Sequence, residues 1–152
     1  MPPVSTPDKT DLPRQPARKL AVLACMDARL DPAQLLGLGL GDAHVIRNAG
    51  GVVSDDAIRS LAMSQHLLGT EEIVLIQHTD CGLLSITDEE FAARLEREAG
   101  RRPEWRAHAF DDLEQNVRDS LAKLRSDPFL PHTDKVTGFV YEVETARLRE
   151  VS

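Results

Sequence analysis

Two cysteines and one histidine stand at spacings that suit a metal ion. The chain has only two cysteines, Cys25 and Cys81, and His78 precedes the second in a His-x-x-Cys pattern. Two intervening residues let a backbone curl round one ion, and two thiolates would neutralise Zn²⁺. Two thiolates and an imidazole bind zinc in a tetrahedron, and three protein ligands leave one position open, as in catalytic sites. The residue types therefore predict such a zinc site.

Two other interpretations of the cysteines stand beside this one. A buried cysteine is often only a small apolar side chain. A disulfide between Cys25 and Cys81 is the other alternative, and a reducing compartment disfavours it. The chain does not open with a charged start followed by an apolar stretch, so we expect a cytoplasmic location without a signal peptide. Metal binding or catalysis is then the expected use of the two thiols.

A carboxylate and a guanidinium follow the first cysteine. Asp27 and Arg29 lie two residues apart, so both side chains face the same side of an extended segment. Asp27 could take the fourth zinc position and close the site, or Arg29 could hold it away by a bidentate ion pair. An ordinary salt bridge is the alternative. Asp80, between His78 and Cys81, is expected to be a local cap or a nearby acceptor and not a ligand.

Gly50 and Gly51 form a second candidate feature. Adjacent glycines allow a positive φ or a close approach of the backbone to a site, although a bare Gly-Gly turn is a weak signal. The remaining histidines have no ligand spacing, and we expect them on the surface or on helix faces: His44, His66, His108 and His132.

The segments before these residues have the pattern of buried strands. Residues 20–25 and 72–77 contain continuous apolar runs, typical of strands covered on both faces, and residues 43–46 form a shorter strand. Helices are predicted over 32–38, after Asp31 as N-cap, and over 55–68, between a Ser54 cap and Gly69. Strand, helix and strand with short connections predict a parallel sheet. Ligands bind beyond the carboxyl ends of such strands, so Cys25, His78 and Cys81 converge if their strands are neighbours.

The second half is predicted to be mainly helical. A capping box opens a helix over 87–99, and an amphipathic helix follows over 111–125. A strand over 136–143, a turn and a strand over 147–151 close the chain. The predicted fold class is α/β, a mostly parallel sheet flanked by helices, without internal repeat or second domain.

Composition limits the class of protein. The 152 residues suit one domain, and 41% apolar residues allow a full core. A net charge of −7 argues against a nucleic-acid or anionic-membrane partner, and the longest apolar run, seven residues, is too short to span a membrane. Five of the nine prolines fall in residues 1–18, which predicts an extended or flexible N-terminal arm. Alternatively, this arm lies on a partner subunit. The predicted catalytic domain then covers residues 19–152.

Three motifs together resemble the β-class carbonic anhydrases, and in particular their small archaeal and mycobacterial branch. They are Cys-Met-Asp-Ala-Arg-Leu at 25–30, Gly-Asp-Ala-His-Val-Ile-Arg-Asn-Ala-Gly-Gly at 41–51 and His-Thr-Asp-Cys-Gly at 78–82. The likeness runs in order from about residue 19 to 151. It implies four parallel strands with an added antiparallel strand, and a homodimer or a dimer of dimers.

The resemblance also implies roles for single residues. Cys25, His78 and Cys81 become the zinc ligands, and Asp27 and Arg29 the catalytic dyad. Plant-type members carry a substrate-side glutamine where this chain has Gly39. The small branch generally lacks this glutamine as well. The hydrogen bond that orients the substrate is therefore unassigned.

The implied reaction is the reversible hydration of CO₂ to bicarbonate and a proton by zinc-bound hydroxide. Asp27 would accept a hydrogen bond from the hydroxide, and Arg29 would keep Asp27 ionised and off the metal. Hydrolysis of carbonyl sulfide or carbon disulfide on the same scaffold is one alternative. A zinc-holding or bicarbonate-binding module without turnover is the other, and the Asp27–Arg29 pair argues against it, because a structural zinc needs no dyad.

Overall fold

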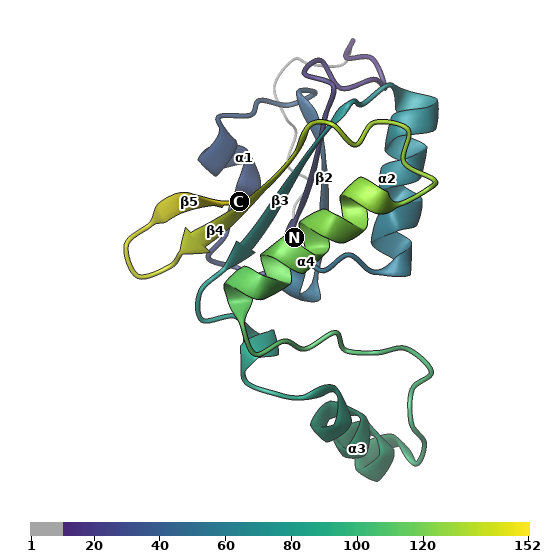
Figure 1. The fold of residues 1–152 in the computed structure, drawn as a ribbon, viewed down its shortest axis with the longest axis vertical. Coiled ribbons are helices and arrows are strands. Elements are labelled where there is room, and N and C mark those ends of the chain that lie inside the picture. The colour runs from purple at the N-terminus through teal and green to yellow at the C-terminus, as the bar shows by residue number, and fades with distance from the viewer. Residues whose placement is uncertain (1–10) are drawn as a thin grey trace, which may run out of the picture.

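In the computed structural model, which describes residues 11–152, five strands form a single sheet (Figure 1). Four of them run parallel, and the last strand pairs antiparallel with the fourth. This confirms the predicted fold class. In spatial order, the strands are β2 (Ala43–Asn48), β1 (Leu20–Cys25), β3 (Glu72–His78), β4 (Val136–Glu142) and β5 (Arg147–Val151).

Helices connect the strands and cover the sheet. Side chains of α2 and α4 pack against one face, and those of α1 pack against the other. Helix α3 stands away from the sheet, beyond the end at which the parallel strands finish (Figure 1). The helices are α1 (Pro32–Leu36), α2 (Asp55–Leu68), α3 (Asp88–Ala99) and α4 (Leu113–Ser126), with short 3₁₀ turns η1 (Ala49–Gly51) and η2 (Gly82–Leu84).

The predicted caps form, and capping also explains where the boundaries differ from the prediction. The side chains of Asp31 and Ser54 accept from the first-turn N–H groups of α1 and α2, and Thr87 forms a complete capping box. Helix α4 begins at residue 113 and not 111, because Asp112 is its N-cap. Helix α1 ends before residue 38, because Gly37 takes a left-handed φ of 63°.

Strands β1 and β3 form the centre of the core. Leu23 and Leu75 lie on the face of the sheet that α2 and α4 cover, and Val22 and Ile76 lie on the face that α1 covers. All four of these side chains are fully buried. Each such side chain contributes about 1.5–3 kcal/mol through its removal from water. The strand predicted over 43–46 extends two residues further, to Asn48, which pairs with Cys25 at the carboxyl end of β1.

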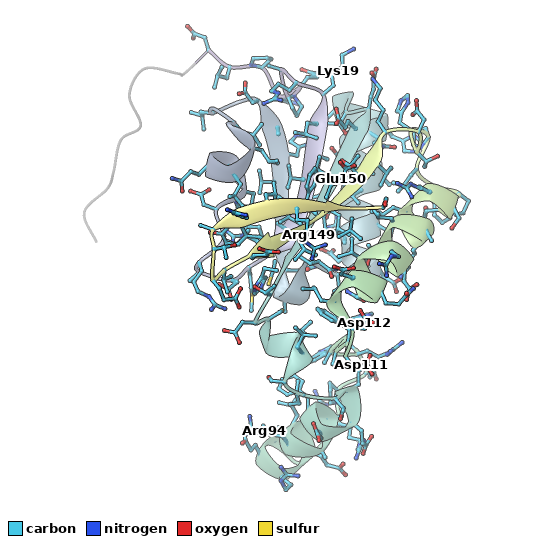
Figure 2. The ribbon with its side chains drawn as sticks, turned by 60° about the vertical axis from the view of Figure 1, so that its left-hand side comes forward. Lys19, Arg94, Asp111, Asp112, Arg149 and Glu150 are labelled. Atoms are coloured by element: carbon cyan, nitrogen blue, oxygen red, sulfur yellow. The ribbon has the colours of Figure 1, made fainter. Side chains whose placement is uncertain are left out.

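Helix α3 lies outside this core. None of its residues is buried, and its apolar contact is Phe91 against Trp105, with ring centroids 6.3 Å apart. Arg94 on α3 and Lys19 before β1 mark opposite ends of the molecule in Figure 2. Over residues 11–152, no helix has both the length and the apolar character needed to cross a membrane.

The predicted N-terminal arm is described in part. The backbone N–H groups of Ala17 and Arg18 donate to the carbonyl oxygens of Gly41 and Asp42, so this end of the arm follows the turn before β2. Residues 1–10 of the arm lie outside the described residues. The division at residue 18 stays a prediction.

Candidate metal centre

The pairing of β1 with β3 brings the predicted ligands together. These two strands are parallel neighbours, so Cys25 and His78 reach the same edge of the sheet, and Cys81 lies in the turn after β3. The two sulfur atoms and an imidazole nitrogen all lie within 4.8 Å of one another. All three side chains are buried, and both cysteines are free thiols. The structure thus places the three residues as the sequence predicts.

The imidazole of His78 is oriented for a metal. Its Nδ1 lies 2.7 Å from the carbonyl oxygen of Thr79, which makes Nδ1–H the donor and leaves the lone pair on Nε2. Over residues 11–152, Nε2 of His78 is the only buried side-chain nitrogen or oxygen atom without a hydrogen-bond partner. Leaving such an atom unpaired costs about 1–3 kcal/mol. A zinc ion would satisfy this nitrogen, so the donor set fits that metal.

The two thiols are unequal. The Cys81 thiol donates to Cys25 and lowers the pKa of Cys25 to about 4, and the N–H of Gly50, 3.3 Å from the Cys25 sulfur, adds to this. The same hydrogen bond, together with burial, raises the pKa of Cys81. The Cys25 thiol therefore gives up its proton more readily, and the Cys81 thiol keeps its own. A metal that binds both thiolates displaces that proton.

Asp27 and Arg29 form the predicted bidentate pair. Arg29 Nε lies 3.0 Å from Asp27 Oδ1, Nη2 lies 2.9 Å from Oδ2, and the Arg29 backbone N–H donates to Oδ1. These donors hold the pKa of the Asp27 carboxyl well below its usual range. Asp27 Oδ2 is also 3.7 Å from Nε2 of His78. The carboxylate thus borders the ligand cluster while Arg29 holds it.

Arg47 is a site residue that sequence reasoning missed. Its guanidinium donates to three backbone carbonyls, those of Cys25 at 3.0 Å, Asp27 at 2.8 Å and Leu30 at 2.7 Å. These contacts hold the loop that carries the dyad against β2. The available signal was its place near the end of a strand, three residues before Gly50, but no spacing pointed to carbonyl partners.

The predicted close approach of the glycines occurs at Gly51. This residue has a φ of +61°, and a Cβ there would lie 2.8 Å from the Cys25 nitrogen and 2.9 Å from the Ile76 oxygen. Its carbonyl accepts from Nε2 of the fully buried Gln77, whose Oε1 accepts from Asn116 on α4. The backbone of Gly51 therefore lies against the ends of both β1 and β3, where there is room only for glycine.

The remaining candidates lie apart from the ligand cluster. Asp80 is an acceptor for Arg29, as expected, and does not belong to the metal-ligating group. Over residues 11–152, no other histidine belongs to such a group. His44 lies half-buried on β2 and bonds Ser64. Gly39 precedes the amino end of β2, whereas the cluster lies at the carboxyl ends.

Comparison with known proteins decides the family. A family model described as carbonic anhydrase matches residues 20–148. Beta-carbonic anhydrase 1 of Mycobacterium tuberculosis is 49% identical over 144 residues, which cover 95% of this chain and 88% of that protein. This chain belongs to the β-carbonic anhydrase family. The resemblance seen in the motifs is confirmed, and family, fold and cluster together support the predicted enzyme class, carbonic anhydrase.

Two further proteins are similar to this chain. The crystal structure of carbonic anhydrase from Streptococcus mutans superposes with a TM-score of 0.87 at 45% identity, and covers 93% of this chain and 86% of that one. Carbon disulfide hydrolase of Acidianus sp. is 39% identical over 157 residues, covering 88% of this chain and 77% of that protein. A protein of this similarity is therefore named for another substrate, carbon disulfide.

A glycine substitution tests the close approach at the metal centre. Gly51→Ala is expected to lower the free energy of unfolding by more than Gly69→Ala. Both glycines have positive φ, a strain of about 1–2 kcal/mol for alanine, but a Cβ at Gly69 meets nothing within 4 Å. Urea denaturation measures the difference, and equal losses would show that the contact with β1 and β3 does not matter.

Proposed function

We propose that this β-carbonic anhydrase catalyses the reversible hydration of CO₂ to bicarbonate and a proton, with Zn²⁺ held by Cys25, His78 and Cys81. The observation that carries the proposal is the partnerless Nε2 of His78, which lies between two thiols and beside the Asp27–Arg29 pair. Zinc bound by such ligands supplies a hydroxide nucleophile near neutral pH, because it lowers the pKa of water.

Asp27 orients the nucleophile in this proposal. Its carboxylate stays ionised at neutral pH, and it can accept a further hydrogen bond because each oxygen has two lone pairs. An O–H that donates to Asp27 has its own lone pair directed elsewhere, toward the carbon of CO₂. Arg29 holds both oxygens of Asp27 and so keeps the carboxylate from becoming a fourth zinc ligand.

The surroundings suit a small uncharged substrate. A cavity of about 540 Å³ is lined by Gly82 of η2, which follows Cys81 in sequence, and by Ala49 of η1, which precedes Gly50, whose N–H donates to the Cys25 sulfur. Apolar side chains, among them Leu83, Ile86 and Phe91, line it further. CO₂ carries no charge for a polar group to hold, so an apolar approach is adequate.

Hydrolysis of carbon disulfide or carbonyl sulfide is the second candidate function. The 39% identity to carbon disulfide hydrolase of Acidianus sp. favours it, and the same nucleophile would attack the carbon of these linear molecules. A stopped-flow CO₂ hydration assay beside a sulfide-release assay separates the two functions. We expect rapid hydration of CO₂.

The zinc ligands are tested by metal analysis and activity together. We expect one zinc per chain, and Cys81→Ala is expected to lose metal and CO₂ hydration, because it removes one of three ligands. Mutation of a residue that only hydrogen-bonds to a metal ligand typically lowers metal affinity by about 10–100-fold. Loss of a ligand itself should lower zinc affinity by more than this. Ser126→Ala, an exposed hydroxyl on α4, is the control and should change neither. Intact zinc binding in Cys81→Ala would contradict the proposal.

The role of Arg29 is tested through pH. The pKa of Asp27 is lowered, so the carboxylate is ionised throughout pH 6–9 and does not itself titrate there. Activity should therefore rise through about pH 7–8, where water on catalytic zinc loses its proton, while lower pH favours the carboxylate as the fourth zinc ligand. Arg29→Ala should retain zinc and lose most turnover. Arg29→Lys should rescue only in part, since a point charge makes no two-pronged pair.

Structures of zinc-loaded protein at about pH 6 and pH 9 provide the direct check on this competition. Asp27 should contact the metal more at the lower pH. The same position of Asp27 at both values, with water on the zinc in each, would overturn it.

We further propose a homodimer or a dimer of dimers in the cytoplasm. The family resemblance implies the assembly, and β2, as an edge strand with the half-exposed Val45, supports it. Met26, the residue before Asp27, is 64% exposed although its side chain is apolar. The free thiols of Cys25 and Cys81 suit a reducing compartment.

Light scattering over a range of concentrations tests this assembly. The expected mass is two or four times the chain mass of 16.8 kDa. An active species that stays at the mass of one chain would show that the proposed assembly is not needed.

A further inference from the structure

We propose that Asp80 is a positioning residue, which anchors Arg29 so that the guanidinium keeps Asp27 off the metal. Arg29 Nη1 donates to Asp80 Oδ2 at 3.0 Å, and Nη2 donates to the Asp80 carbonyl at 3.1 Å. Asp80 lies in the turn that carries Cys81, and Arg29 lies in the loop after Cys25. One side chain thus joins the two loops that supply the metal ligands. This inference rests on the proposed function.

The donors of Arg29 are divided between two carboxylates. A guanidinium has five N–H groups in one plane. Nε and Nη2 serve Asp27, while Nη1 and Nη2 serve Asp80. Because the group is rigid, it cannot rotate away from Asp27 without breaking both contacts with Asp80. The hold on Asp27 therefore depends on a second anchor on the neighbouring edge of the plane, formed by Nη1 and Nη2.

The backbone of Asp80 is suited to this anchor. Its φ is +54°, in the left-handed region, where aspartate and asparagine are better tolerated than most residues. The carbonyl and the carboxylate of Asp80 both accept from the one guanidinium. The anchor is thus provided by main chain and side chain together.

A purely electrostatic role predicts the opposite result. The Asp80 side chain is 73% exposed, so its ion pair is worth only about a two- to fivefold change in an equilibrium. Acting by charge alone, Asp80 would repel an anion that approaches the metal, and its removal would tighten anion binding. Acting through Arg29, its removal frees Asp27 to compete for the metal and weakens anion binding. The sign separates the two roles.

The test uses Co²⁺-loaded protein titrated with thiocyanate and followed by the cobalt absorption bands. Asp80→Gly removes the carboxylate and fits the positive φ, and Asp80→Asn keeps the size and an acceptor. We expect the thiocyanate Kd to rise about two- to fivefold in Asp80→Gly and less in Asp80→Asn, because fewer molecules have the metal free of Asp27. Tighter or unchanged binding in Asp80→Gly would overturn the proposal.

Two controls make the result specific. Asp56→Asn removes another exposed carboxylate, which pairs with Arg59 at 2.8 Å on α2, and it should leave the Kd unchanged. In an Asp27→Ala background the competitor is absent, so Asp80→Gly should no longer weaken thiocyanate binding. A full effect in that background would show that Asp80 does not act through Asp27.

A metal-free measurement keeps the inference separate from the proposed function. In ¹⁵N NMR spectra of the apo protein, the Nε–H of Arg29 should exchange faster with water in Asp80→Gly than in the parent or Asp56→Asn. Unchanged exchange would overturn the anchoring role. Absence of CO₂ turnover in the parent protein, with these shifts present, would refute the proposed function and leave the role of Asp80 intact.

Discussion

The parallel pairing of β1 with β3 is the interaction on which the rest of this structure depends. It lies at the centre of the sheet, buried by α2 and α4 on one face and by α1 on the other. Because both strands are parallel, both end at the same edge, and a cysteine and a histidine meet there from segments more than fifty residues apart. Burial of the apolar side chains of these strands therefore stabilises the pairing that brings the polar site together.

The polar contacts around that edge divide into two tasks. Arg47 satisfies main-chain carbonyls and so holds the shape of the loop after β1, whereas Arg29 holds a side chain within that loop. Both arginines act in the half-exposed rim and not in the core. The buried cluster itself contains the two thiols and the imidazole, and the two sulfur atoms and the partnerless Nε2 of His78 are suited to binding a cation.

Much of the fold and of the site follows from local signals. The apolar runs of β1 and β3 and the caps at Asp31, Ser54 and Thr87 are all found, since these features depend on residues close in sequence. The contacts of Arg47 and the Gln77–Asn116 hydrogen bond were not predicted, because their partners become neighbours only after the sheet forms. The observed ends of α1 and α4 differ from the predicted ends by one or two residues, because a single capping residue sets each boundary: Gly37 after α1 and Asp112 before α4.

Helix α3 and the segment after it have a different physical status from the rest of the chain. No side chain of α3 is buried, and surface ion pairs, such as those of Arg102 with Glu89 and Glu96, connect it to the following segment. Opening it would expose little apolar surface, so it belongs to the low-stability end of the range of local unfolding. The sheet and the metal centre can then remain folded while this part opens. A protease would reach residues 88–110 first, and the products would still hold the strand ends together.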